Sequence, residues 1–213
     1  FKEARGYFAR PKDEETYPGV VMIHEWWGLN DNIKNMAREL AKEGYQVLAV
    51  DLYGGEVATT SEDAQKLRNA ISPADAVLNL RGATAYLHGA KAPKIASLGW
   101  CFGGGQSLAL ALSGEKLDAT VIYYGSLVTD QGELKKISWP VLGIFGAEDR
   151  AIPVATVSTF RDALSSLGIE NGVHIYPGVG HAFANPSGQS YAPEETKDAW
   201  GKTLVFLETN LKK

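Results

Sequence analysis

The sequence is poor in cysteine and lacks long apolar runs. Cys101 is the single cysteine among 213 residues, so no disulfide can form within the chain. No stretch approaches the roughly 18 consecutive apolar residues of a membrane-spanning helix, and no signal peptide is visible. We therefore expect no membrane partner. The chain starts at Phe1 and not at a methionine, which is compatible with a removed leader. The cytoplasm is slightly favoured as its location, and an exported form stays open.

The sequence also lacks an excess of positive charge. It has 21 Lys and Arg residues against 25 Asp and Glu residues, and its formal net charge is −4 at pH 7. Because nucleic-acid-binding proteins carry a basic surface, we expect no nucleic-acid partner. No His, Cys or Asp cluster has the spacing of a metal site, and we expect neither a metal nor another cofactor. The hydrophobic fraction of 45% is ordinary for a globular protein.

Strand-like and helix-like segments alternate along the whole chain. Residues 19–25, 45–55, 94–100, 118–125, 141–146 and 172–178 are β-rich, and residues 30–45, 61–71, 73–90, 102–112, 154–168 and 194–211 have helical character. This alternation predicts an α/β fold with a mostly parallel central sheet and helices on both faces. The N-terminal "RGYFARP" can add an antiparallel edge strand. With no repeat and no linker-like segment, residues 1–213 are expected to form a single domain.

The lone cysteine lies in "GWCFGGG", between the strand-like "KIASL" and the helix-like "QSLALAL". Gly99, Cys101 and Gly103 form G-x-C-x-G, which is the G-x-S-x-G elbow with a thiol in place of the hydroxyl. In that motif the nucleophile occupies a strained strand-to-helix turn, and side chains two residues away on either side would collide. A helix that begins at Phe102 would point its N–H groups at the sulfur and favour a thiolate.

The same segment allows two other interpretations. A free cysteine is often a small buried apolar residue without chemistry. Alternatively, glycines between a strand and a helix can bind the phosphates of a dinucleotide. The second interpretation fits poorly, because Cys101 occupies the place of the second glycine in G-x-G-x-x-G and the segment lies in the middle of the chain.

An elbow nucleophile needs an acid and then a histidine, in that order along the chain. His24 and His88 precede Cys101, and His174 lies inside a predicted strand. His181, in the glycine-flanked "GVGHAF" after the last strand, is therefore the candidate base. For the acid, "AEDR" after "VLGIFG" offers Asp149, which is favoured, and Glu148 as the fallback. Asp51 precedes the nucleophile and is expected to cap a turn.

Several motifs together resemble the dienelactone hydrolase family of α/β-hydrolases. They are "HEWWGLN", "DLYGG", "GWCFGGG", "YYG", "GAEDR" and "GHAF", and their order and spacing cover nearly the whole chain. The resemblance implies the α/β-hydrolase fold and a triad of Cys101, Asp149 and His181. It also implies a catalytic role for Glu25 near the thiol, and an oxyanion hole formed by the backbone N–H groups of Trp26 and Phe102.

Aromatic residues gather in the same motifs and predict an apolar substrate pocket. The candidates for substrate contact are Trp27, Tyr53, Trp100, Tyr124 and Phe183, with Trp26 beside them. Part of this set is expected to pack in the core instead. The intervals from Cys101 to Asp149 and from Asp149 to His181 leave no room for a large cap domain, so the site should be comparatively open.

The sequence departs from the family pattern at two positions. The resemblance implies an arginine shortly after "GHAFA", where Asn185 stands. It implies a second arginine in the helix after "DLYGG", where Ser61 and its neighbours stand, with Arg68 nearby. In the family these arginines hold a substrate carboxylate, so dienelactone itself does not carry over as the substrate.

The sequence therefore predicts a cysteine-dependent hydrolase of carboxylic esters or lactones that forms an acyl-thioester intermediate. Its partner would be a small-molecule ester or lactone, and the chain is expected to be a monomer or a weak dimer. Two other classes stay open. One is a thiol redox or sensor protein, although the chain has no second cysteine and no C-x-x-C. The other is a non-catalytic binding module on the same scaffold.

Overall fold

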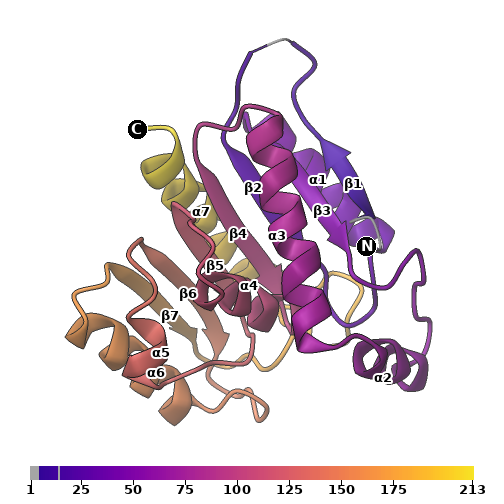
Figure 1. Ribbon diagram of the computed structural model, residues 1–213. Helices are drawn as coiled ribbons and strands as arrows, with labels where there is room; N and C mark the ends of the chain where they lie inside the picture. Colours follow the sequence, from indigo (N-terminus) through magenta and orange to yellow (C-terminus); the bar gives the residue numbers. More distant parts are fainter. Residues whose placement is uncertain (1–4, 14) are drawn as a thin grey trace.

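The computed structural model describes residues 5–13 and 15–213, and its core is a seven-stranded sheet (Figure 1). The order across the sheet is β1-β3-β2-β4-β5-β6-β7. The strands are β1 (Arg5–Ala9), β2 (Gly19–Ile23), β3 (Gln46–Asp51), β4 (Ile95–Trp100), β5 (Ala119–Tyr123), β6 (Val141–Gly146) and β7 (Asn171–Tyr176). All neighbouring pairs are parallel except β1 and β3, which are antiparallel. The predicted edge strand in "RGYFARP" is therefore confirmed.

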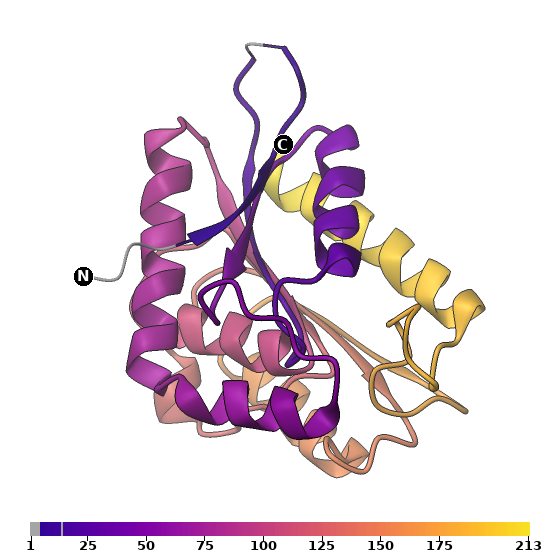
Figure 2. The ribbon, with the colours of Figure 1, turned by 90° about the vertical axis from the view of Figure 1, so that its right-hand side faces the viewer.

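Helices cover both faces of the sheet, as Figure 2 shows with the sheet seen nearly edge-on. The helices are α1 (Asp31–Lys42), α2 (Ser61–Ala70), α3 (Pro73–Gly89), α4 (Phe102–Leu112), α5 (Gln131–Leu134), α6 (Val154–Ser166) and α7 (Pro193–Leu211). Residues of α1 and α7 share one apolar core with the sheet, and residues of α3, α4, α5 and α6 share the other. The predicted α/β fold with two helical layers is confirmed.

The two cores follow from the alternation of side chains along each strand. In β2, Val20 and Met22 belong to the core under α1 and α7, while Val21 and Ile23 belong to the core under α3 and α4. A central strand with helices on both sides is apolar at every position, and β2 is buried throughout. The short α5 was not predicted. None of the described helices is both long enough and apolar enough to cross a membrane.

The carboxyl ends of the parallel strands meet at one edge of the sheet. Loops after β2, β4, β5, β6 and β7 therefore lie together although they come from distant parts of the sequence. The segment from Cys101 to Asp149 holds α4, β5, α5 and β6, and the segment from Asp149 to His181 holds α6 and β7. Neither segment contains a cap domain, as the spacing predicted.

Candidate active site

The turn between β4 and α4 holds Cys101 in a strained conformation. Its φ is +53°, in the left-handed region that residues with side chains rarely adopt. A Cβ on Gly99 would lie 2.1 Å from the carbonyl oxygen of Gly103, and one on Gly103 would lie 2.3 Å from the carbonyl oxygen of Ile23. The two glycines of the motif are thus required by close backbone contacts, and they bring the sulfur to the carboxyl edge of the sheet.

Three side chains from three different loops form a chain of hydrogen bonds. The Sγ atom of Cys101 lies 3.1 Å from Nε2 of His181, and Nδ1 of His181 lies 2.7 Å from Oδ2 of Asp149. The other carboxylate oxygen of Asp149 accepts hydrogen bonds from the backbone N–H groups of Ala151 (2.8 Å) and Ile152 (3.0 Å). The two backbone N–H groups therefore hold the Asp149 carboxylate in place, and its other oxygen orients the imidazole.

Within this series of hydrogen bonds, each group stabilises the charged form of its neighbour. Burial alone would lower the pKa of His181, but its hydrogen bonds with Asp149 and Cys101 outweigh burial and raise that pKa to about 10. For Asp149, burial acts in the opposite direction and raises the pKa. Its hydrogen bonds with His181 and with two backbone N–H groups lower the pKa more strongly, so the net shift is downward. An ionised acid beside a protonated imidazole stabilises a thiolate at the sulfur.

The residues that were weighed against this set lie elsewhere. Glu148 is exposed, whereas its neighbour Asp149 is buried and contacts His181. Asp51 accepts a hydrogen bond from the backbone N–H of Tyr53 at 3.0 Å, which confirms the turn that it was expected to cap. His174 lies in β7. The structure thus brings Cys101, Asp149 and His181 together, and leaves the fallback residues apart from them.

Glu25 follows β2 and is almost fully buried, with 4% of its surface exposed. Its Oε2 accepts a hydrogen bond of 2.5 Å from the side-chain amide of Asn185. Burial raises the pKa of Glu25 to about 7, against smaller lowering effects of His181 and Asn185. Among the described residues, no hydrogen bond joins Glu25 to Cys101, because the sulfur contacts His181 instead. Asn185, at the position of the family arginine, is therefore a partner of the acid.

His24, which immediately precedes Glu25, is buried and bridges two loops. Its Nε2 accepts a hydrogen bond from the backbone N–H of Leu52 at 3.2 Å. The proton of the neutral ring must then be on Nδ1, which donates to the carbonyl oxygen of Glu25 at 2.5 Å. Burial lowers the pKa of His24 to about 4 and keeps this neutral form at ordinary pH. Sequence reasoning set His24 aside and missed this contact.

A cavity of about 740 Å³ opens over the sulfur. Its wall includes Glu25, Trp26, Trp27, Cys101, Phe102 and Tyr124. Ser61 and Arg68 of α2 also line it, so Arg68 does reach the site, whereas Arg150 is not part of the lining. Sequence reasoning missed Ser126 and the segment 187–190. The signal for these was present, since "YYGS" and "NPSGQS" directly continue motifs that were recognised.

Three of the five predicted substrate-contact residues do not line this cavity. Trp27 and Tyr124 do, whereas Tyr53, Trp100 and Phe183 do not. Trp100 is the last residue of β4, and side-chain alternation turns it to the core under α1 and α7, where its ring packs 5.5 Å from that of Tyr123. Phe183 is fully buried in the same core.

Tyr53 packs against neighbouring rings and does not line the cavity. Its ring packs against the rings of His24, at 4.7 Å, and Phe102, at 6.0 Å, and it is 8% exposed. It therefore contacts the elbow through Phe102, the residue that follows Cys101. The predictions of substrate contact for Tyr53, Trp100 and Phe183 are corrected accordingly, because all three are packing residues here.

Comparison with known proteins agrees with this architecture. The sequence profile of the Dienelactone hydrolase family matches residues 4–211. A protein of Saccharolobus solfataricus, provisionally named carboxymethylenebutenolidase, is 31% identical over 95% of this chain and 93% of its own length. A Yersinia pestis protein of the same provisional name is 32% identical over 96% of this chain and 83% of its own.

Solved structures give the same result. The crystal structure of a provisionally assigned dienelactone hydrolase from Klebsiella pneumoniae superposes with a TM-score of 0.85 and 30% identity, covering 95% of this chain and 91% of that one. The sequence match and the fold thus extend together over almost the whole length. The chain belongs to the dienelactone hydrolase family, whose members are ester and lactone hydrolases of the α/β-hydrolase fold.

Proposed function

We propose that the protein hydrolyses carboxylic esters or lactones with Cys101 as nucleophile, His181 as base and Asp149 as the orienting acid. The thiolate attacks the carbonyl carbon, and His181 gives its proton to the leaving alkoxide. This leaves an acyl-thioester on Cys101. His181 then takes a proton from water, the hydroxide attacks the thioester, and the released thiolate and imidazolium return the site to its initial state.

The observation that carries the proposal is the continuous contact from sulfur to carboxylate. Sγ to Nε2 is 3.1 Å and Nδ1 to Oδ2 is 2.7 Å, distances at which protons can be transferred without rearrangement. A buried cysteine without chemistry would not require a positive φ or an aligned imidazole and acid.

The backbone N–H groups of Trp26 and Phe102 would form the oxyanion hole. Both residues line the cavity beside Cys101. Neither N–H donates a backbone hydrogen bond to another described residue. Free N–H groups beside the nucleophile are the donors that a tetrahedral oxyanion needs.

Neutral esters and lactones fit the cavity better than substrates with a free carboxylate. The amide of Asn185 is engaged with Glu25, and Glu25 itself would repel an anion when ionised. Arg68 of α2 is the one arginine or lysine in the described lining.

The test is hydrolysis of a neutral aryl ester by Cys101→Ala, His181→Ala and the double variant. Each single variant should lose about 10³-fold or more in kcat, and the double variant should lose little more, because the residues act as a unit. His88→Ala, an exposed histidine of α3, serves as the matched control and should keep full activity.

Multiplying losses in the double variant would contradict a shared mechanism. Full activity of Cys101→Ala would remove the cysteine from the reaction. Absence of hydrolysis across a panel of esters and lactones, with reversible oxidation of Cys101, would favour a thiol sensor instead.

A further inference from the structure

A second depression adjoins the catalytic cavity and extends away from it. It lies between α3, α4 and residues 126–128, and its volume is about 770 Å³. Arg68, Phe102 and Ser126 line both this depression and the cavity over the sulfur. The two spaces therefore share a wall at the start of α4, and the second is called the acyl groove below.

The walls of the acyl groove are mainly apolar. The aliphatic residues that line it include Val77, Leu78, Leu108, Ala109, Leu112 and Leu127. Leu78 leaves 54% of its surface exposed. Apolar surface of this kind, arranged along a concave channel beside a reactive group, is the chemistry that binds a hydrocarbon chain. From Phe102 to Leu112 the helix rises roughly 15 Å, which is the length of a chain and not of a small group.

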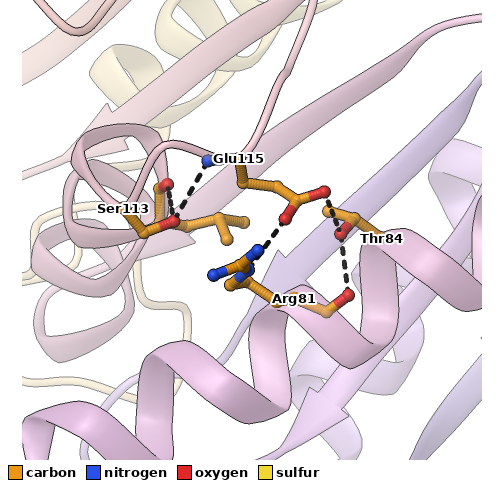
Figure 3. A network of polar contacts seen from close by, with 5 residues as sticks. Arg81, Thr84, Ser113 and Glu115 are labelled. Carbon is orange, nitrogen blue, oxygen red and sulfur yellow. Dashed lines mark hydrogen bonds and ion pairs between the residues drawn. The ribbon is translucent and has the colours of Figure 1, made fainter.

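The far end of the acyl groove is polar, but its polar groups are already bound to one another (Figure 3). Nε of Arg81 donates to Glu115 at 3.0 Å, and the hydroxyl of Thr84 donates to the other oxygen of the same carboxylate at 3.0 Å. Ser113 donates to the carbonyl oxygen of Leu110 at 2.7 Å. The charge of Arg81 is thus paired with Glu115, and this end presents no free cation for a second carboxylate.

The position of His181 decides which half of an ester enters the acyl groove. The leaving alkoxide must lie next to Nε2 of His181, because that atom supplies its proton. His181 lines the catalytic cavity but not the acyl groove. The acyl half therefore extends from Cys101 past Phe102 and Ser126, on the side away from the imidazole.

Resting on the proposed function, we propose that the acyl groove binds the hydrocarbon chain of the acyl group, and that the substrates are esters of medium-chain monocarboxylic acids. A chain in the groove contacts α3 on one side and α4 on the other. Its terminal methyl group points towards the paired Arg81 and Glu115, so no group at that end selects for a charged terminus.

The first experiment measures kcat/KM for aryl esters of acetate, butyrate, octanoate and laurate. Burial of a methylene contributes enough for about a fourfold gain, and in a half-open groove we expect about twofold per methylene. Octanoate should therefore exceed acetate by at least about tenfold. A parallel series of acetates with lengthening alcohols should show no such rise.

Two variants test the walls. Ala74→Phe in α3 and Ala109→Phe in α4 both introduce a ring into the acyl groove. Each should lower the ratio of the octanoate rate to the acetate rate by about tenfold, since the introduced ring displaces the chain. Ala85→Phe is the matched control: Ala85 is an exposed alanine of α3, like Ala74, but lies outside the groove, and its variant should keep the wild-type chain dependence.

A reaction that needs no ester hydrolysis separates this proposal from the proposed function. The Cys101 thiolate displaces iodide from iodoacetamide or from N-octyl iodoacetamide, and mass spectrometry gives both rates. The quantity compared is the rate with the octyl reagent divided by the rate with iodoacetamide. This ratio should be at least about tenfold higher in the wild type than in Ala109→Phe. This holds even if no ester is turned over.

Three results would overturn the acyl groove: hydrolysis and alkylation that are both independent of chain length, a length effect on the alcohol side only, or an equal loss in Ala85→Phe. Absence of ester hydrolysis with a normal chain effect on alkylation would overturn the proposed function and retain the groove.

Discussion

At the scale of single residues, the Glu25 carboxyl has a pKa that its surroundings shift strongly. It is buried, its pKa is about 7, and the amide of Asn185 holds one of its oxygens. Because its pKa is raised above the unfolded value, Glu25 retains a proton in the folded state that the unfolded chain has lost. The folded protein is then penalised as pH rises from 4.5 towards 7 and above.

Glu25→Gln should remove this penalty. The amide of glutamine has nearly the same shape and can still accept the hydrogen bond from Asn185. Relative to wild type, the free energy of unfolding of the variant should increase with pH by about 3 kcal/mol, since each pKa unit is worth about 1.4 kcal/mol. Urea unfolding of both proteins between pH 4 and pH 8 measures the difference, in which the contributions of all other groups cancel.

The exposed Glu148 offers a control, and Glu148→Gln should show no such pH dependence. A stability difference between Glu25→Gln and wild type that stays constant over this range would mean that Glu25 has the same pKa in the folded and the unfolded chain. Alkylation of Cys101 in the same variant tests the catalytic role: removal of a negative charge near the sulfur should speed the reaction with iodoacetamide at neutral pH.

At the scale of elements, His24 connects the loops after β2 and β3. Its Nδ1–H donates to the carbonyl of Glu25, and that carbonyl belongs to the same peptide group as the N–H of Trp26. In a planar trans peptide the C=O and N–H point in opposite directions. The hydrogen bond from His24, together with the one that the Gly28 N–H donates to the same oxygen at 3.2 Å, therefore fixes the direction of the Trp26 N–H. His24 would be a positioning residue for the proposed oxyanion hole.

Two substitutions separate the halves of this bridge. Asn at position 24 keeps a donor near the Nδ1 position, whereas Gln keeps a group near the Nε2 position that can accept from Leu52. His24→Gln should lose about tenfold in kcat with little change in KM, because a misdirected donor acts on the transition state. His24→Asn should stay close to wild type in kcat, although both lose stability.

Equal kcat values in the two variants, with equal losses of stability in urea, would leave His24 a purely structural residue. Steady-state kinetics on a single neutral ester, read beside the unfolding curves, distinguishes these outcomes.

The same elements explain how far the sequence could predict the site. Cys101, Asp149 and His181 each follow a strand within a few residues, so local pattern and chain order were sufficient to select them. Trp100 could not be assigned this way, because the sheet face to which a strand residue turns depends on register. Phe183 could not be assigned either, because it lies in a turn whose packing is set by distant parts of the chain. The Asn185–Glu25 hydrogen bond joins residues 160 positions apart and has no local signal.

At the scale of the whole molecule, the proposed reacting groups lie at the carboxyl edge of the sheet. The described loops at the other edge contribute no residue to the cavity. The turn between α6 and β7 is one of these. Gly168 in this turn is exposed, and a Cβ there would have nothing within 4 Å. The loop that includes Gly188 instead lines the cavity.

A short Gly-Ser insertion after Gly168 should therefore leave kcat/KM within about twofold of wild type, because exposed turns tolerate added residues. The same insertion after Gly188 should cost about tenfold or more, since it displaces the cavity wall. Circular dichroism on both proteins checks that each is folded. A comparable loss at the two positions would mean that the edges of the sheet are not independent.

The separation of the two edges also determines how the molecule could be attached to a solid support. A tether introduced at the α6–β7 turn would hold every copy with its amino edge towards the surface and its cavity towards the solution. Substrate would then reach immobilised molecules as freely as dissolved ones. A tether near Gly188 would press the opening against the support, so the yield of active sites would depend on the side of the sheet that is anchored.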